Sequence, residues 1–260
     1  MTRSRADATT GRATTSGALA AASSGSILPG VVYGSTTDAV TDALREEILS
    51  GTLAPNTWIR EHEIAERFSV SRTPVREAMR RLSDEGLTNR SANRGTVVAP
   101  MSLDDILAVY AVRESLEGLA AQTAAARRPT GLVEALSIVH KEMEDSQGDV
   151  AKLAALNLQF HGILRDASNN SYLERFLRQV EYAVRRFQRS TYEVPGRAQE
   201  TLNEHYAIIA AIAAGDAATA ESCAIEHMRR AREARLSQVL RHRFNYDSPD
   251  VVALDNSFER

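Results

Sequence analysis

The sequence has 260 residues, 43% of them hydrophobic and 25% charged, which is enough to bury one large core or two ordinary ones. The single cysteine, Cys223, excludes an internal disulfide framework, and no stretch approaches the roughly 18–20 apolar residues that cross a bilayer. The N-terminus also lacks the apolar segment of a secretory signal, so we expect a cytoplasmic protein, and its net charge of −3 gives no sign of a nucleic-acid partner.

Ordered structure is predicted to begin after residue 35. Residues 1–35 are mainly Thr, Ser, Ala, Gly and Arg without apolar periodicity, which predicts a disordered tail. From Thr37 to Gly51, apolar residues recur at helical spacing and predict a first helix. Residues 61–68 continue this pattern for two turns, which predicts a second and shorter helix.

A third helix is predicted from Ser71 to about Leu82, after a tight bend. Ser71 is a good N-cap, and a proline falls in the first turn, where its missing N–H does little harm. The apolar positions of this helix form one stripe, which leaves Arg72, Arg76 and Arg80 on the exposed face.

The next segment predicts a small wing. Residues 88–90 and 96–99 are expected to pair as short strands around a turn. Between Arg67 and Arg94, seven arginines stand against three acidic residues, so this segment is basic although the chain is acidic. A helix, a sharp turn, an arginine-bearing helix and a wing together present one helix to the major groove of DNA. Residues 36–100 are therefore predicted to be a winged helix-turn-helix domain.

A second, all-helical domain is predicted for residues 101–246. Ser102 and Asp105 resemble a capping box that opens a helix running to about Arg128. Proline, glycine and asparagine interrupt the helical pattern five times, which divides the segment into six helices of an antiparallel bundle. The fold class is thus mostly α, and residues 247–260 are predicted to be a tail.

Three of the six histidines occupy apolar stripes of this bundle. His161, His205 and His227 lie on three different predicted helices, and Asn157 precedes His161 by one turn on the same face. Burying a neutral imidazole requires a partner. One alternative is that each histidine is satisfied by a core hydrogen bond. The other is that the three imidazoles and the amide oxygen bind a divalent metal such as zinc or nickel.

Arg113 is a further polar residue among apolar neighbours, on the first helix of the bundle. If it points inward, its guanidinium matches a carboxylate ligand. The alternatives are an ion pair with Glu117 one turn later, or simple exposure. His62, His140 and His242 have no such context and are predicted to lie at the surface, with His62 near DNA.

The sequence resembles a known family. Residues 61–87, EHEIAERFSVSRTPVREAMRRLSDEGL, and residues 93–98, NRGTVV, resemble the winged-helix signature of GntR-type bacterial transcription regulators. In the helical part, YAVRESLE at 110–117, NLQFH at 157–161, and the segments around His205 and His227 are similar to the FCD effector domain of the FadR-like subgroup. The resemblance covers about residues 37–243.

This resemblance implies roles for the predicted DNA-binding residues. The arginines at the start of the third helix would read bases, a later arginine and two hydroxyls would contact the backbone, and the wing would approach the minor groove. At His62 the subgroup often has an arginine that assists operator contact. The residues concerned are Ser71, Arg72, Thr73, Arg76, Arg80, Arg94, Gly95 and His62.

The resemblance also implies a sensor in the helical domain. Asn157, His161, His205 and His227 would hold the metal, although the subgroup often has Asp where this chain has Asn157. Arg113 would clamp a small carboxylate effector that also reaches the metal. Members of the family are typically dimers that bind palindromic operators.

The expected function is a homodimeric, ligand-responsive transcription regulator, more specifically a repressor, with no catalytic residues. One rival is a metalloenzyme that uses the three-histidine site. The sequence has no HExxH motif, and Glu204, beside His205, should point away from it because adjacent helical positions point apart. The other rival is an architectural DNA-binding protein without a ligand.

Overall fold

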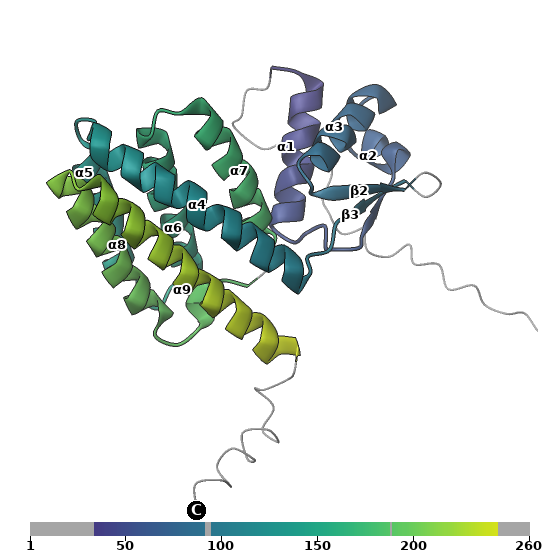
Figure 1. The fold of residues 1–260 in the computed structure, drawn as a ribbon. Helices are drawn as coiled ribbons and strands as arrows, with labels where there is room; N and C mark the ends of the chain where they lie inside the picture. The colour runs from purple at the N-terminus through teal and green to yellow at the C-terminus, as the bar shows by residue number, and fades with distance from the viewer. Residues whose placement is uncertain (1–33, 92–94, 188, 244–260) are drawn as a thin grey trace, which may run out of the picture.

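The computed structural model describes residues 34–91, 95–187 and 189–243 (Figure 1). In these residues the chain forms nine α-helices, one short 3₁₀ helix and three short strands. Of the predicted tails, residues 1–33 of the first and the whole of the second, residues 247–260, lie outside the described residues. None of the described helices combines the length and apolar character of a membrane-spanning segment.

The N-terminal part packs three helices against a small sheet. Its apolar core is built from α1, α3 and the strands, with Leu44, Val75, Leu82 and Leu87 fully buried. The antiparallel sheet has the order β1-β3-β2. The elements are α1 (Thr36–Leu49), β1 (Trp58–Ile59), α2 (Glu61–Arg67), α3 (Arg72–Asp84), β2 (Thr88–Ser91) and β3 (Gly95–Val98).

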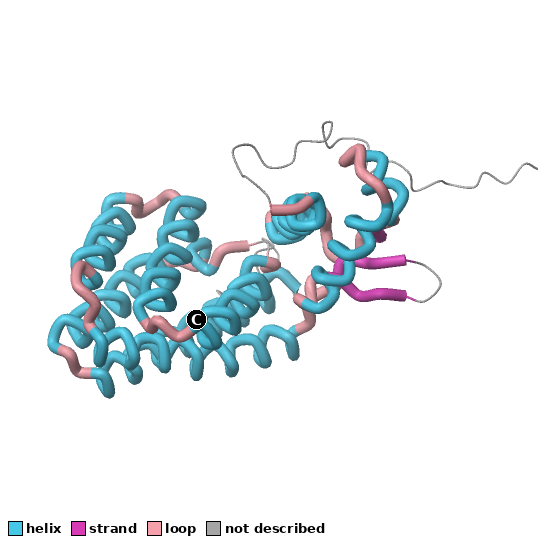
Figure 2. Tube along the Cα trace, turned by 90° about the horizontal axis from the view of Figure 1, so that it is seen from above, coloured by secondary structure: helices cyan, strands magenta, loops and turns pink. Residues whose placement is uncertain are grey.

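The strands β2 and β3 form the predicted wing, and Figure 2 shows them projecting on the side away from the bundle. The strand β1 was not predicted, because two residues are too few to establish a period of two. The bend between α2 and α3 is tight: Ser69 has a positive φ of 55° and the Val70 N–H donates to the Ala65 carbonyl at 2.9 Å.

The C-terminal part contains the six predicted helices. The longest two, α4 and α9, run side by side, and α5, α6 and α8 complete a core lined by leucine, isoleucine and alanine (Figure 1). The capping box of Ser102 and Asp105 is present. The elements are α4 (Leu103–Arg127), α5 (Leu132–Asp145), α6 (Val150–Ala167), α7 (Ser171–Arg185), η1 (Thr191–Glu193), α8 (Arg197–Ala214) and α9 (Ala217–Arg243).

The C-terminal end of helix α7 contacts the N-terminal part. Arg185 pairs with Glu46 of α1 at 2.7 Å. Arg186, the C-cap of α7, donates to the carbonyls of Gly86 at 3.1 Å and Pro100 at 3.3 Å, and also to that of Ala99. The end of α7 is therefore held against both α1 and the segment that leaves the wing.

Candidate functional site

The N-terminal turn of α3 is exposed and carries an unused N-cap. Ser71 is the N-cap with an extended backbone, yet its hydroxyl makes no capping hydrogen bond, and the first turn contains no acidic residue. Ser71, Arg72 and Thr73 are exposed. Because a helix N-terminus carries partial positive charge, this turn is suited to an anion such as a DNA phosphate.

The other predicted contact arginines of α3 are engaged in ion pairs. Arg76 pairs with Glu61 of α2 at 3.0 Å, and Arg80 pairs with both Glu77 and Asp84 at 2.8 Å. Arg72 has no ion pair within the described residues. The basic character expected from the sequence is thus largely offset by these ion pairs, and a contact of Arg76 or Arg80 with DNA would require the guanidinium to leave its carboxylate partners.

The remaining predicted DNA-binding residues lie at the edges of this surface. Gly95 begins β3 with a φ of 97°, a conformation that favours glycine. Arg94 lies outside the described residues. His62 is exposed on α2, with Nε2 3.9 Å from Glu63.

The three predicted histidines meet in the core of the helical part. His161 comes from α6, His205 from α8 and His227 from α9, and one ring nitrogen of each lies within 4.8 Å of the others. The Nε2 atom of His227 is 3.2 Å from Nε2 of His161 and 3.3 Å from Nε2 of His205. A tetrahedral zinc with Zn–N bonds of about 2.0–2.1 Å separates its nitrogen ligands by roughly 3.3 Å.

Two buried carboxylates fix the orientation of these imidazoles. Glu117 Oε2 lies 3.1 Å from Nδ1 of His161, and Glu204 Oε2 lies 2.6 Å from Nδ1 of His227. A carboxylate only accepts hydrogen bonds, so each Nδ1 carries the proton and each Nε2 presents a lone pair. Lone pairs that face each other at 3.2 Å repel unless a cation lies between them, so this donor set fits a metal ion.

The protonation states agree with this arrangement. Burial, and then the charge of the neighbouring imidazoles, hold the pKa values of His205 and His227 well below the usual value, so both rings are neutral. Burial opposes ionisation of Glu117, but His161 and Arg113 outweigh it and lower the pKa of Glu117 to about 2. His205 stacks on Phe160 at 3.8 Å between ring centroids, and its Nδ1 has no partner.

Arg113 joins the same network. It is buried, and its Nε donates to Glu117 at 3.2 Å. The inward orientation and the ion pair, which the sequence left as alternatives, are both present. Asn157 lines the same pocket as Arg113 and His227, and its Oδ1 accepts a hydrogen bond from the Tyr192 hydroxyl at 3.0 Å.

Two predictions about polar residues were wrong. Glu204 does not point away from the site: its side chain crosses from α8 to His227, while Arg197 pairs with both carboxylate oxygens at 2.7 Å. His140 is not a surface residue, because its side chain is mostly covered and its Nε2 lies 3.0 Å from the Leu202 carbonyl. The side chain of His242 lies outside the described residues.

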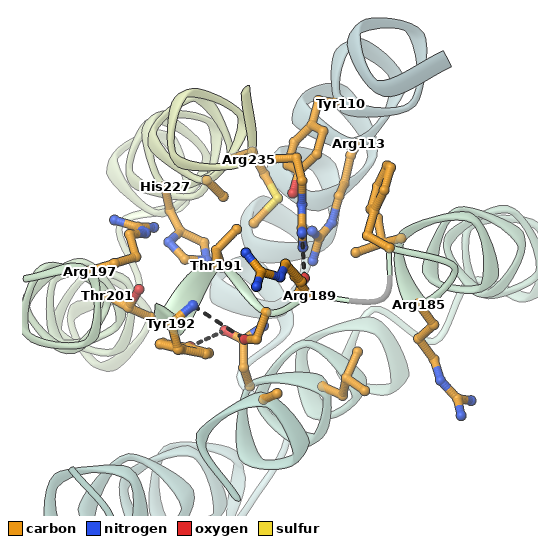
Figure 3. Close-up of a pocket in the computed structure, with 18 residues that line it drawn as sticks. Tyr110, Arg113, Arg185, Arg189, Thr191, Tyr192, Arg197, Thr201, His227 and Arg235 are labelled. Atoms are coloured by element: carbon orange, nitrogen blue, oxygen red, sulfur yellow. Dashed lines mark hydrogen bonds between the residues drawn. The ribbon is translucent and has the colours of Figure 1, made fainter. Parts of the chain in front are cut away.

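A pocket of about 240 Å³ opens beside His227. Figure 3 shows His227, Tyr192, Arg189 and Arg235 around it, whereas Arg185 points away. Helices α4, α6, α7 and α9, the 3₁₀ helix η1 and the segment before it all contribute to the wall. A cavity of this size, with several guanidinium groups among apolar side chains, suits a small anionic molecule.

Two functional candidates were missed in the sequence, although a signal was present for each. Arg235 continues the buried stripe of α9 two turns beyond His227, where the analysis of the stripe had stopped. Arg197 lies seven residues before Glu204 and therefore on the same face of α8. By contrast, Tyr192 lies in η1, which has no periodic pattern to predict it.

Comparison with known proteins agrees with this architecture. Residues 36–98 match the gntR family of bacterial regulatory proteins, and residues 108–230 match the FCD domain. The transcriptional regulator YdhC of Bacillus subtilis is 29% identical over 78% of this chain and 85% of its own length. A probable D-xylose utilization operon transcriptional repressor of Paenarthrobacter nicotinovorans is 31% identical over 73% of this chain and 84% of its own.

A solved structure, that of E. coli McbR/YncC, has the same fold, with a TM-score of 0.67 and 22% identity over 80% of this chain and all of that one. The relatives are transcription regulators, which excludes the metalloenzyme alternative. The chain therefore belongs to the GntR family of bacterial regulatory proteins, as a DNA-binding transcription regulator with an FCD domain.

Proposed function

We propose that this regulator is a homodimeric repressor whose affinity for a palindromic operator changes when a small carboxylic acid binds beside a divalent metal in the helical domain. The observation that carries the proposal is the convergence of three buried imidazoles next to a pocket with an inward-facing Arg113. The name of the P. nicotinovorans relative, a probable repressor, supports the sign of regulation.

The metal would be zinc or nickel, held by His161, His205 and His227 with Asn157 as a fourth ligand. Neutral imidazoles suit both ions. Asn157 is a neutral donor and adds no charge, so an acidic ligand would complete the charge balance. A bound divalent ion would supply a Lewis acid for the carboxylate of the effector, and the guanidinium of Arg113 would fix the orientation of that carboxylate.

On the DNA side, Arg72 is the strongest candidate for reading a base, because its guanidinium has no ion pair with any residue that the structure describes. Arg76 would read a second base after leaving Glu61, and Arg80 would contact phosphate. The unused hydroxyl of Ser71 and that of Thr73 would bind the backbone at the helix N-terminus. Arg94, Gly95 and His62 would extend these contacts to the wing and the flank of α2.

A second copy of the chain would cover an apolar stripe on α4. The stripe follows the exposed side of this 25-residue helix and consists of small and apolar side chains. Its members are Leu107, Ala108, Ala111, Val112, Ser115 and Leu119. Val112→Glu should yield a monomer by light scattering, whereas Ile138→Glu, at an exposed apolar position on α5, should leave the dimer intact.

The pocket and the DNA-binding domain share α7. Val184, near its C-terminus, and Phe187, just after the helix, line the pocket, while Arg185 and the C-cap Arg186 bind the N-terminal domain. A ligand that draws this segment inward would bias the position of the winged domain. Regulation requires only that the ligand binds one arrangement of the domains more tightly than the other.

The test begins with operators selected from a random duplex pool by the purified protein. Binding by fluorescence anisotropy is then measured with and without zinc and a panel of small carboxylates, for the wild type, Arg113→Ala and His205→Ala. We expect at least one acid to change wild-type affinity and neither variant to respond. If no acid changes the operator affinity, and both variants keep the DNA affinity and the thermal stability of the wild type, the protein is a ligand-free architectural DNA binder instead.

Base reading is tested separately. Arg72→Ala should lose about 1–3 kcal/mol at the selected operator and relax the base preference at one position of each half-site. A uniform loss over all sequences would place Arg72 on phosphate.

A further inference from the structure

The far end of the pocket contains a buried guanidinium without a carboxylate. Arg235 lies on α9 two turns, or about 12 Å along the helix axis, beyond His227. Only 5% of the residue is exposed. Its Nη1 donates to the Arg189 carbonyl and to Oε1 of Gln238 at 2.6 Å, and its guanidinium lies over the ring of Phe187. Its Nε has no hydrogen-bond partner in the part of the chain that the structure describes.

The other buried guanidiniums of the site are neutralised. Arg113 has Glu117, and Arg197 has Glu204. Within the described residues, no carboxylate pairs with Arg235. A buried charge without a counterion is strongly unfavourable, so a structural role alone, which a neutral amide could fill, does not account for an arginine here.

Arg189 adds to the positive charge at this end. It lines the same pocket, and its only ion pair among the described residues is a loose one with Glu193 at 3.6 Å on the surface. Figure 3 shows Arg189 and Arg235 directed toward the pocket from different segments. These two cations therefore have one weak, solvent-exposed carboxylate, which pairs with Arg189 alone, and this end of the pocket carries excess positive charge away from Arg113.

We propose that the effector is a short dicarboxylate. One carboxylate lies at Arg113 beside the histidine cluster, and the other is bound by Arg235 and Arg189. This inference rests on the proposed function for the first carboxylate, whereas the second follows from the unpaired charge of Arg235. The pocket volume of about 240 Å³ limits the chain between the two groups to a few carbons.

The experiment compares acids that differ only in the second carboxylate. Zinc-loaded full-length protein is titrated calorimetrically with succinate against butyrate, and with glutarate against valerate. In each pair, the monocarboxylate has a methyl group where the dicarboxylate has its second acid. We expect the better dicarboxylate to bind at least about 10-fold more tightly than its partner, as for one additional charge-assisted contact.

Arg235→Gln should reduce this preference to within about 2-fold and leave the affinity for the monocarboxylate unchanged. Arg235→Lys, which keeps the charge without the planar fork, should retain part of the preference. Arg241→Gln, at an exposed position of the same helix, serves as the matched control and should behave as the wild type. Thermal midpoints without ligand show whether each variant folds.

Three results would overturn the proposal. In the wild type, the two members of each pair could bind equally, or no dicarboxylate could bind with a Kd below about 1 mM. Alternatively, a folded Arg235→Gln protein could lose affinity for the dicarboxylate and for the monocarboxylate by the same factor. If Arg235→Gln does not fold, the wild-type comparison and Arg235→Lys decide. If the dicarboxylate proposal fails but a monocarboxylate still shifts operator affinity through Arg113, the proposed function stands. If dicarboxylates bind as expected but operator affinity does not change, the proposed function fails and the dicarboxylate site stands.

Discussion

The carboxylate of Glu117 should control how tightly the histidine cluster binds a metal. Glu117→Gln keeps the shape of the side chain but replaces a charged acceptor, 3.1 Å from His161 Nδ1, by a neutral amide oxygen. A hydrogen bond to a charged group contributes about 1.5–3 kcal/mol, and a neutral one about 0.5–1.5 kcal/mol. The difference of roughly 1–1.5 kcal/mol predicts about 10-fold weaker zinc binding, at the lower end of the 10- to 100-fold range of such outer partners.

The variant also changes the protein without metal, so two measurements are needed. Glu117 pairs with Arg113 at 3.2 Å, and its removal leaves that guanidinium without a carboxylate. We therefore expect a lower thermal midpoint of the metal-free protein. Zinc affinity is measured by competition with a chromophoric chelator at a temperature where both proteins are folded, so that loss of stability does not count as loss of affinity.

Glu114→Gln is the matched control. Glu114 lies on the same helix and pairs with Arg229 and Arg232 of α9, but it contacts none of the three imidazoles. It should leave zinc affinity unchanged within about 2-fold. Equal effects of the two variants on zinc affinity would show that the contact with His161 does not orient a metal ligand, and the reasoning would be refuted.

Three further predictions concern DNA binding, pH and coupling. Glu61→Gln releases Arg76 and should raise operator affinity by no more than a few-fold in anisotropy titrations, because the ion pair is exposed, whereas Glu66→Gln on the same helix serves as control. Because the folded pKa values of His205 and His227 are lowered, the metal-free protein should lose stability as pH falls below 6.5, by up to about 1.4 kcal/mol per pH unit for each proton; a flat midpoint from pH 7.5 to 5.5 would contradict this. Arg186→Gln removes a contact between α7 and the N-terminal domain, so effector binding should change operator affinity less than in the wild type. An unchanged ratio of the affinities with and without effector would show that α7 does not couple the pocket to the DNA-binding domain.

The sequence predicted the positions that depend on a long helical period. The stripes of α6, α8 and α9 placed three imidazoles in one core, and they lie within 4.8 Å there. The period fails for short elements, so the two-residue strand β1 and the three-residue η1 were not predicted. Since η1 presents Tyr192 to Asn157, part of the pocket wall was also out of reach.

The sequence also could not predict where the ends of long side chains lie. Helical geometry gives the direction of the Cα–Cβ bond but not the rotamer of a long side chain. Glu204 starts on the flank of α8 beside His205, yet its carboxylate arrives at His227 because Arg197 holds both of its oxygens. The ion pairs of Arg76 and Arg80 were similarly hidden, since the first joins two helices and the second depends on the rotamers of an exposed face.

Charged groups of the pocket also hold the segment that contacts the N-terminal domain. Arg185 and Arg186, which hold the N-terminal domain, and Arg189, which lines the pocket, lie within five residues of one another at the end of α7 and in the segment after it. Arg235 holds the same segment through the Arg189 carbonyl, and Gln238 does so through the Ser190 carbonyl at 2.7 Å. An anion bound by Arg235 would compete for the guanidinium that now fixes this backbone. The charge of the ligand would thus act directly on the segment at the end of α7, which also contacts the DNA-binding domain. No chain of side-chain rearrangements through the core would be needed.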